Sequence, residues 1–493
     1  MKPLYRTTSL CSTCKNALPA EVFSTADGEV FMHKRCPEHG EQQVRLSTDA
    51  DWYMATRATE QRLVEPRGER RDVEHGCPFD CGPCQQHDQS VRLPVVTITS
   101  ACNLDCPICY VHNKNKDAYH MPVAEFRQIL GHLRREHGEI DIVNFTGGEP
   151  LLHPEFAEFL RLSREANVHR VTICSNGIRL ARDENLVRQL AEAGARVALS
   201  FDTFDEAVDY ELQGARLLDI KMRCIELLDK HGVDTTLIPV MTKGLNDHEI
   251  GRILELAWKT RCIRHVEVHT ITFTGQGGTN FSRSGRISMV EVLDRIATTT
   301  SGLLTRADFV PSPCAHPLCY QIAYLLLDPE GGAPIPFTRF LSRETLYECL
   351  SERLYIEPSR KLERAMLDAI DRLWISDDSD AERTIRILKN LLGQLFPRDR
   401  VMTQAEALRV SELASKAVYV HSHMDEETFD TERIVSCCDS NCYADGSTVP
   451  VCAYNVLYRD KEEHFMLKPM TWSARSGGQK SFPPRVGRLP VLT

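Results

Sequence analysis

Three cysteines at CxxxCxxC spacing are the residues most specific for chemistry in this chain. Cys102, Cys106 and Cys109 lie in the stretch CNLDCPICY, directly after the apolar run PVVTITSA. Three thiolates on one short loop suit a cubane iron–sulfur cluster, because its irons prefer soft sulfur ligands. Three protein ligands leave one iron of a cubane free. The motif therefore predicts a [4Fe–4S] cluster with one open iron.

A second stretch, GCPFDCGPCQQH, repeats this spacing upstream with Cys77, Cys81 and Cys84. No strand-like run is expected around it, so we predict an auxiliary [4Fe–4S] cluster here instead of a second open-iron site. The sequence does not identify the fourth ligand of this cluster. The alternative is a zinc knuckle, which uses the same thiolates but cannot pass electrons.

The N-terminal region offers a different ligand pattern, CSTC followed by CPEH. Cys11, Cys14, Cys36 and His39 would supply four soft or borderline ligands on two knuckles. Such a set suits a closed tetrahedral site for one zinc ion or one rubredoxin-type iron. The alternative is that His39 is a surface turn residue and that a cysteine from elsewhere completes the site.

The C-terminal part holds further cysteines in PCAHPLC and in SCCDSNC followed by PVC. These stretches contain more thiols than the four ligands of one cluster, so some are free or one reaches the cluster at Cys77. The sequence does not choose the set. The candidate ligands of a second auxiliary [4Fe–4S] cluster are Cys314, Cys319, Cys437, Cys438 and Cys452.

Apolar runs alternate with amphipathic segments from about residue 94 and predict an α/β fold. Strands are expected at PVVTIT, IDIVNFT, HRVTIC, RVALSF, TTLIPVM and HVEVHTITF. Helices are expected between them over Val123–His137, Pro154–Ala166, Asn185–Ala193 and Asp247–Lys259. Six strand–helix units predict a parallel sheet curled into a partial (β/α)6 barrel, with its chemistry at the carboxyl ends of the strands.

The distribution of cysteines, apolar runs and helical patterns along the sequence divides the chain into three regions. We expect a cysteine-rich metal-binding region over 1–90, the partial barrel over 91–300 and a mostly helical α+β domain over 301–493. In the last region a strand is expected at QIAYLLLD. Helices are expected there over Lys361–Trp374, Glu382–Phe396 and Gln404–Val418, the last beginning with a capping box of Thr403 and Glu406.

Composition limits the classes of function. The 69 acidic residues outnumber the 59 basic ones and give a net charge of −10, which argues against general nucleic-acid binding. Clustered cysteines without a signal-peptide pattern favour metal binding in a reducing cytoplasm over disulfides. The sequence shows no membrane-spanning run, so we expect at most peripheral contact with a membrane.

The open-iron motif, taken together with TGGEP at 146–150, resembles the radical S-adenosylmethionine (SAM) superfamily. The resemblance implies that the amino and carboxylate groups of SAM bind the open iron and that SAM is cleaved to a 5'-deoxyadenosyl radical. It also implies an electron donor such as ferredoxin or flavodoxin. The positions that it assigns to SAM binding are Ile108, Tyr110, Gly147, Gly148, Glu149, Ser175, Asn176, Ser200 and Asp202.

The order of all the cysteine motifs resembles a narrower group, the tetraether lipid synthases and their dihydropterin methyltransferase-like relatives. This resemblance implies three [4Fe–4S] clusters, one mononuclear iron or zinc, and carbon–carbon bond formation on lipid alkyl chains. A methyltransferase acting on a pterin or another small molecule is the alternative and would use the same clusters. A multi-cluster electron carrier or sensor is a third reading, which TGGEP disfavours because an electron carrier needs no loop for an amino acid.

Overall fold

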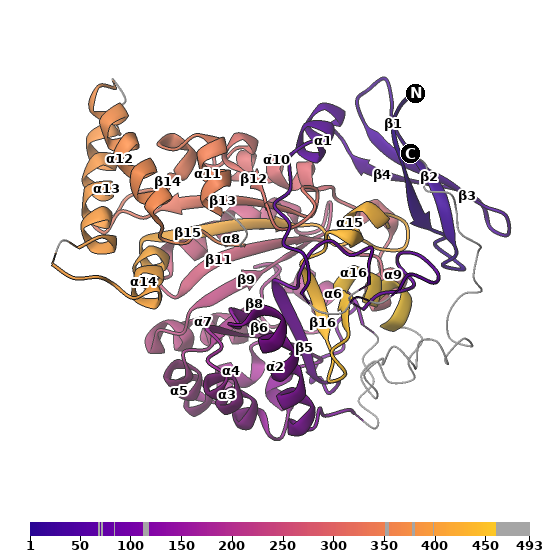
Figure 1. Cartoon of the computed structure of the whole chain (residues 1–493), viewed down its shortest axis with the longest axis horizontal. Coiled ribbons are helices and arrows are strands. Elements are labelled where there is room, and N and C mark those ends of the chain that lie inside the picture. Colours follow the sequence, from indigo (N-terminus) through magenta and orange to yellow (C-terminus); the bar gives the residue numbers. More distant parts are fainter. Residues whose placement is uncertain are drawn as a thin grey trace.

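Among the residues that the structure describes, the strands form two sheets, and the first is small and antiparallel. The computed structural model describes residues 1–67, 70, 72–82, 84–111, 118–350, 354–376, 380–397 and 399–459. The small sheet has the order β1-β2-β3-β4 and lies at one side of the molecule (Figure 1). Its elements are β1 (Lys2–Leu10), β2 (Ala17–Ser24), β3 (Val30–Cys36) and β4 (Gly40–Ser47), followed by α1 (Ala50–Arg57).

The larger sheet contains the six parallel strands that the sequence predicts. They are β5 (Leu93–Thr99), β6 (Ile142–Gly147), β7 (Arg170–Ser175), β8 (Arg196–Ser200), β9 (Thr235–Ile238) and β11 (Ile263–Thr270). Each strand pairs in parallel with the next, and β10 (Val240–Met241) also pairs with β11. The sheet is curled but not closed into a barrel. Its strand order begins at one edge strand and ends at another, and these two edge strands do not pair with each other. The expected partial barrel is therefore confirmed.

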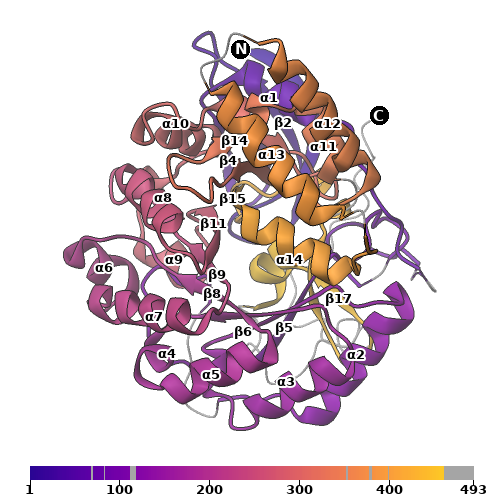
Figure 2. The ribbon, with the colours of Figure 1, turned by 90° about the vertical axis from the view of Figure 1, so that its left-hand side faces the viewer.

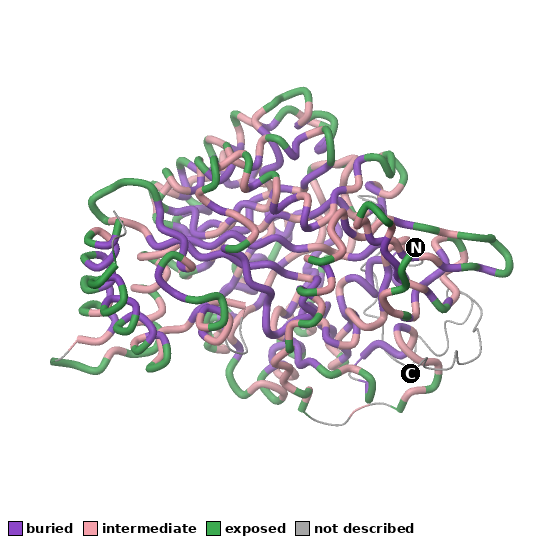
Figure 3. The backbone as a smooth tube through the Cα atoms, turned by 90° about the horizontal axis from the view of Figure 1, so that it is seen from above, coloured by how far each residue is buried: buried purple, intermediate pink, exposed green. Residues whose placement is uncertain are grey.

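Helices follow the strands and cover the outer face of the curved sheet. In Figure 2, α2, α3, α5 and α7 lie in an arc around the strands. The helices of this part are α2 (Val123–His137), α3 (Phe156–Glu165), α4 (Ile178–Arg182), α5 (Glu184–Ala193), α6 (Glu206–Gln213), α7 (Leu218–His231), α8 (Ile250–Lys259), α9 (Gly275–Asn280) and α10 (Met289–Thr299). Their apolar faces pack on the strands, so the centre of the molecule is buried (Figure 3).

One expected helix is shorter than its sequence pattern indicates. Helix α14 (Gln404–Ala414) begins with the predicted capping box, but it ends four residues before Val418 and strand β15 (Ser415–His421) follows. The expectation of a helix through Val418 was wrong. The run KAVYVH is rich in β-branched and aromatic residues, which suit a strand paired on both sides. β15 pairs in parallel with β11 and antiparallel with β13 (Tyr320–Leu326).

The remaining C-terminal elements form a helical layer beside this edge of the sheet. Figure 1 shows α12 and α13 at the side of the molecule opposite to the small sheet. These helices pack on each other and on β13 through a separate apolar cluster. The elements are β12 (Val310–Pro311), β14 (Ile335–Pro336), α11 (Arg343–Leu350), α12 (Arg360–Trp374) and α13 (Ala381–Leu395).

After β15 the chain returns across the barrel to its first strand. β16 (Asp439–Cys442) pairs in parallel with β5, and β17 (Thr448–Pro450) pairs with β16. The segment also includes α15 (Thr431–Val435) and α16 (Val451–Ala453). It touches the small sheet, where Thr7 Oγ1 donates to Asp430 Oδ1 at 2.6 Å. No helix among the described residues has the length and apolar character that crossing a membrane requires.

Candidate functional site

The cysteine loop with the open-iron spacing lies at the carboxyl end of β5. Its backbone is anchored by two neighbouring elements, since Ile108 N donates to Leu212 O of α6 at 3.1 Å and Gly277 N of α9 donates to Cys109 O at 2.9 Å. Burial raises the pKa of all three thiols, that of Cys102 to about 12. Thiols in this surrounding become ionised only when a cation compensates the charge, as a metal ligand requires.

The glycines of TGGEP are in direct contact with the start of this loop. Gly147 pairs with Thr99 across the sheet. A Cβ atom at Gly147 would lie 2.0 Å from Thr99 O, and one at Gly148 would lie 2.2 Å from Ala101 O. No side chain fits at such distances, so only glycine allows the two loops to meet. The structure thus brings the two motifs together.

Glu149 is buried behind these glycines and links three strand ends. Its backbone N donates to Ala101 O at 2.7 Å. Its carboxylate accepts from Ser175 Oγ at 3.0 Å and from Asn176 N at 2.8 Å. Burial raises the pKa of Glu149 to about 7, against these hydrogen bonds, which lower it. The carboxylate is therefore held in place near the cysteine loop by the strand end that carries SNG.

The predicted residues Ser200 and Asp202 take part in a second network, around a buried lysine. Lys221 Nζ donates to Ser200 Oγ at 2.9 Å and to Gln213 Oε1 at 3.0 Å. Asp202 Oδ1 accepts from Val240 N at 2.8 Å, and its other oxygen accepts from Gln213. Lys221 is close enough to Cys106 to lower the pKa of that thiol, against a larger effect of burial. This network therefore lies on the Cys106 side of the loop.

Tyr110 connects the cysteine loop to a cavity inside the curved sheet. The guanidinium of Arg459 lies 5.0 Å from the centre of the Tyr110 ring. In the same loop, the backbone carbonyl of Ile108 lies close to Gly277 of α9. The cavity has a volume of about 250 Å³. Polar and aromatic side chains on several strands line it, among them Tyr110, Asn144, Thr146, Thr172, Thr236, Glu267, His269, Tyr320, His421, His423 and Arg459.

The other predicted cysteine groups border one another beside β5. Cys438 O accepts from Leu93 N at 3.0 Å, and Cys314 O accepts from Gln89 Nε2 at 2.6 Å. Cys81 packs in the same apolar cluster as Cys452. Burial raises the pKa of Cys437, and the nearby Asp439, Cys452 and Cys319 raise it further. The structure therefore brings the C-terminal cysteines together and sets them against the loop that holds Cys77, Cys81 and Cys84.

The N-terminal ligand set converges more tightly than any other predicted group. One ligand atom from each of Cys11, Cys14, Cys36 and His39 lies within 4.8 Å of the others. His39 Nδ1 is 3.4 Å from Cys36 Sγ, and Gln42 Nε2 donates to Cys11 Sγ at 3.1 Å. These four residues can hold one tetrahedral ion, and His39 is part of the group.

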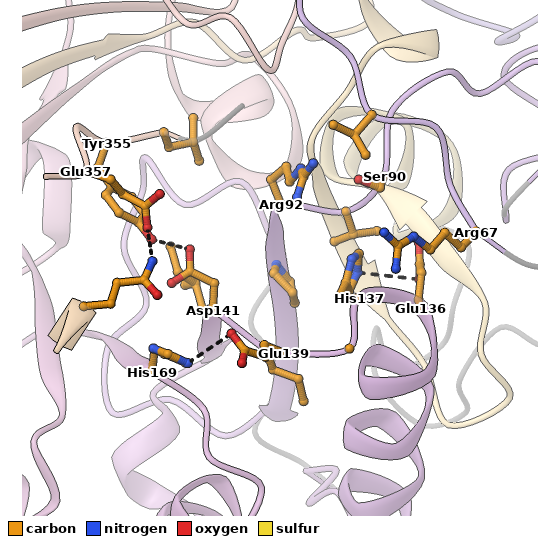
Figure 4. Close-up of a pocket in the computed structure, with 18 of the residues that line it drawn as sticks. Arg67, Ser90, Arg92, Glu136, His137, Glu139, Asp141, His169, Tyr355 and Glu357 are labelled. Carbon is orange, nitrogen blue, oxygen red and sulfur yellow. Dashed lines mark hydrogen bonds and ion pairs between the residues drawn. The ribbon is translucent and has the colours of Figure 1, made fainter. Parts of the chain in front are cut away.

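A larger cavity, of about 410 Å³, lies at the opposite edge of the sheet, where the strands begin. Figure 4 shows its charged lining, with Glu136 and His137 at one side and His169 beside Glu139 at the other. Tyr355 OH donates to Asp141 Oδ2 at 2.6 Å. Burial raises the pKa of Glu136 to about 7 and lowers that of His137 to about 4. In barrels of this kind the chemistry lies at the other edge, so we assign no catalysis here.

Sequence reasoning missed several polar residues inside the barrel. Glu267 and His269 alternate on β11, and His421 and His423 alternate at the end of β15. Burial lowers the pKa of His421 to about 4. The signal was present on β11 as the period-two run HVEVH, in which every second residue is polar, whereas His423 lies beyond the end of β15 and follows the polar Ser422.

Comparisons with known proteins agree with this geometry. A sequence profile described as the radical SAM superfamily matches residues 96–257, and one described as the HMPTM N-terminal zinc ribbon domain matches residues 3–48. The chain is 29% identical to a protein of Methanocaldococcus jannaschii named 7,8-dihydro-6-hydroxymethylpterin dimethyltransferase, over 95% of this chain and 96% of that one. It is 31% identical to a GTP 3',8-cyclase of Chlorobaculum tepidum, over 33% of this chain and 48% of that one.

A solved structure of SuiB from Streptococcus suis is similar over 43% of this chain and 46% of that one, with 18% identity and a TM-score of 0.34. The radical SAM profile covers both the cysteine loop and the glycine loop that contacts it, and this class of enzyme implies SAM and a [4Fe–4S] cluster. Residues 96–257 of the chain form a radical SAM domain. An electron carrier without catalysis is therefore not retained.

Proposed function

We propose that this enzyme forms carbon–carbon bonds, by methyl transfer or a related radical step, on a small polar substrate of the pterin class. The observation that supports it is the lumen cavity of about 250 Å³, near the lower end of the roughly 300 to 1,000 Å³ range of small-molecule pockets. Most of the cavity lining is apolar, and tyrosine rings and hydrogen-bonding side chains lie within it, a combination that can bind a flat ring carrying a few polar atoms. The name of the M. jannaschii relative, a pterin dimethyltransferase, points to the same class.

The residues at the barrel mouth fit the cluster and SAM. Cys102, Cys106 and Cys109 would hold the cluster, and when bound it supplies the electron that cleaves SAM. Gly147 and Gly148 let the glycine loop lie directly against the start of the cysteine loop, because a side chain at either position would clash with its backbone. Glu149 would accept from the ammonium group of SAM, held in orientation by Ser175 and Asn176.

The other cysteine groups would hold the remaining metals. We assign an auxiliary [4Fe–4S] cluster to the Cys77 group and another to the C-terminal cysteines, and a single zinc or iron ion to the N-terminal site. Cys442 is not needed, because its side chain packs in the main core. A small electron carrier such as ferredoxin or flavodoxin would reduce the cluster at the barrel mouth.

Coupling of lipid alkyl chains stays a second candidate, because a radical acceptor beside the cavity would serve it as well as methyl transfer. Cys452 Sγ lies 3.6 Å from His423 Nδ1, and His423 lines the lumen cavity. A cluster held by Cys452 would therefore lie close to a substrate in the cavity, where it could accept a carbon radical. Methyl transfer and lipid coupling differ in the substrate that has to enter, and the described cavity is small for two long chains.

The test is anaerobic reconstitution of the full chain, followed by dithionite, SAM and either a dihydropterin or an archaeal-type diether lipid. We expect 5'-deoxyadenosine in every case and a methylated product with the pterin. A coupled lipid would favour the second candidate. Absence of 5'-deoxyadenosine with all clusters assembled would contradict the proposed roles of the cysteine loop.

A further inference from the structure

Three histidines that none of the cysteine motifs predicts gather in the lumen cavity. His269 lies on β11, His421 ends β15, and His423 follows two residues later. One ring nitrogen from each lies within 4.8 Å of the others. The rings of His421 and His423 are 3.9 Å apart between centres, and both are 5.1 Å from that of His269. Strand β11, the end of the adjacent parallel strand β15 and the residue two positions beyond it thus bring three imidazoles close together.

A carboxylate orients two of these rings. Glu267 Oε1 lies 3.0 Å from His269 Nε2 and 3.2 Å from His421 Nδ1. Hydrogen bonds of this kind leave the opposite nitrogen of each ring, Nδ1 and Nε2 respectively, available for another partner. Carboxylates bonded to the outer nitrogen of a histidine are the usual support of metal-binding histidines, because they fix the tautomer and the ring orientation.

Further groups hold the cluster of rings rigid and add negative charge. Tyr320 stacks on His421 with 3.7 Å between ring centres, and its hydroxyl donates to Asp439 Oδ2 at 2.5 Å. That oxygen is 3.9 Å from His421 Nε2. Two carboxylates therefore lie against three imidazoles in a buried place. The arrangement offers a divalent cation both nitrogen ligands and compensation of its charge.

We infer that His269, His421 and His423 form a binding site for one divalent transition-metal cation, distinct from the cysteine sites. Three imidazoles suit ions of borderline softness such as Zn²⁺ or Fe²⁺. Three protein ligands leave a further position that faces the cavity, as catalytic and substrate-binding metal sites do. An oxygen or nitrogen of the substrate can bind there. This last role rests on the proposed function, whereas binding of the cation does not.

The competing explanation is that His423 belongs to the auxiliary cluster beside it. Its Nδ1 is 3.6 Å from Cys452 Sγ, so a cluster ligand at this position has to be distinguished from a ligand of a separate ion. The two explanations differ in the metal that is lost when His423 is replaced. A separate site loses one zinc per chain and no iron, while a cluster ligand loses iron and sulfide.

The experiment is zinc binding by the full chain after anaerobic reconstitution of its clusters. Zinc, iron and sulfide per chain are measured after dialysis against zinc, in the absence of SAM and substrate. The variants are His269→Gln, His421→Gln and His423→Gln. The control is His265→Gln on the same strand, since His265 also lines the cavity but is outside the three-histidine group. Zinc bound at the N-terminal site is the same in all variants, so it cancels when their zinc contents per chain are compared.

We expect each of the three variants to lose one zinc per chain with unchanged iron and sulfide, and the control to lose none. Diffraction at the zinc absorption edge from crystals of the unsubstituted protein should show an anomalous peak between the three rings, which does not depend on how the variants fold. Absence of that peak overturns the inference. So does loss of iron and sulfide in His423→Gln. Neither result bears on formation of 5'-deoxyadenosine, which tests the proposed function separately.

Discussion

The N-terminal ligand set and the cysteine loop at the barrel mouth both present thiols, but they are built differently. The four N-terminal ligand atoms lie within 4.8 Å of one another. Among the described residues, Cys102, Cys106 and Cys109 do not meet that distance. A single ion needs its ligands to converge on one point, whereas a cubane spaces its thiolates around a larger body. The difference in spacing thus matches the two kinds of metal site proposed here.

The two regions also differ in what holds them when no metal is bound. The barrel loop is fixed by backbone hydrogen bonds to α6 and α9 and by its contact with Gly147 and Gly148. Cys11 also makes backbone hydrogen bonds, with Asn16 and Lys15, but the local apolar cluster around the N-terminal ligands consists of the cysteines themselves and Leu18. We therefore expect metal loss to destabilise the small sheet, and to leave the barrel loop folded but without chemistry.

The largest effect is expected for replacement of Cys102, Cys106 and Cys109 together by alanine. Formation of 5'-deoxyadenosine should fall to background, because no ligand then holds the cluster that supplies the electron. The unfolding temperature should change by only a few degrees, since the loop is anchored by its backbone. Product analysis and thermal unfolding of the same preparation measure both. Retained SAM cleavage would refute the assignment of this loop.

Replacement of Cys11 and Cys14 by serine should lower stability and leave SAM cleavage intact, the reverse of the effect expected at the barrel mouth. The small sheet should lose several kcal/mol of stability, roughly as structural zinc sites contribute, because the ion then lacks two of its four ligands. SAM cleavage at low temperature should persist. Hydrogen exchange of β1–β4 measures the effect, and His33→Gln is the control, because His33 lies on β3 outside the ligand group. Unchanged protection of the sheet would show that the site is not structural.

Residues close together in the sequence could be predicted as a site, whereas residues brought together by pairing of distant strands could not. Ligand spacing within one loop is local, so the Cys77 and Cys102 groups and the six barrel strands could be predicted directly, whereas the C-terminal cysteine set could not. The convergence of His269 with His421 depends on β15 pairing with β11, across more than a hundred residues of chain. Because the helical pattern of α14 obscured that strand, its partners could not be predicted. The polar alternation on β11 was visible, but the adjacency of β11 and β15 was not.

A smaller effect on the barrel mouth is expected for Gly275→Ala. Gly275 has a φ of +57°, and a Cβ atom there would lie 2.3 Å from the carbonyl of Tyr110. Gly232 has a similar φ of +68° with nothing within 4 Å of such an atom. Both alanine variants should lose about 1 to 2 kcal/mol through the left-handed backbone.

Only Gly275→Ala should also displace the cysteine loop, because only there does the new methyl group meet it. We expect fewer clusters per chain and slower SAM cleavage, by about tenfold, relative to Gly232→Ala. Iron content and the rate of 5'-deoxyadenosine formation measure this. Equal activity of the two variants would show that the contact between α9 and the loop does not position the cluster.

The smallest effect is expected for Ser175→Ala, which tests the carboxylate behind the glycines. Ser175 Oγ donates to both oxygens of Glu149, and this hydrogen bond favours the ionised carboxylate. Its loss should weaken binding of the SAM ammonium group by less than about 1 kcal/mol, because the hydroxyl acts on SAM only through Glu149, which keeps its hydrogen bonds from Leu151 N and Asn176 N. Ser163→Ala is the control, since that buried hydroxyl bonds within α3.

The pH dependence of the same variant gives the sharper measurement. Burial already raises the pKa of Glu149 to about 7, so a fraction of the carboxyl is protonated near neutral pH and cannot pair with an ammonium group. Without the Ser175 hydroxyl the pKa rises further. The KM for SAM should therefore increase as the pH falls, and in Ser175→Ala this increase should begin at higher pH than in the unsubstituted enzyme. Parallel profiles of KM against pH would show that Glu149 does not bind SAM through its charge.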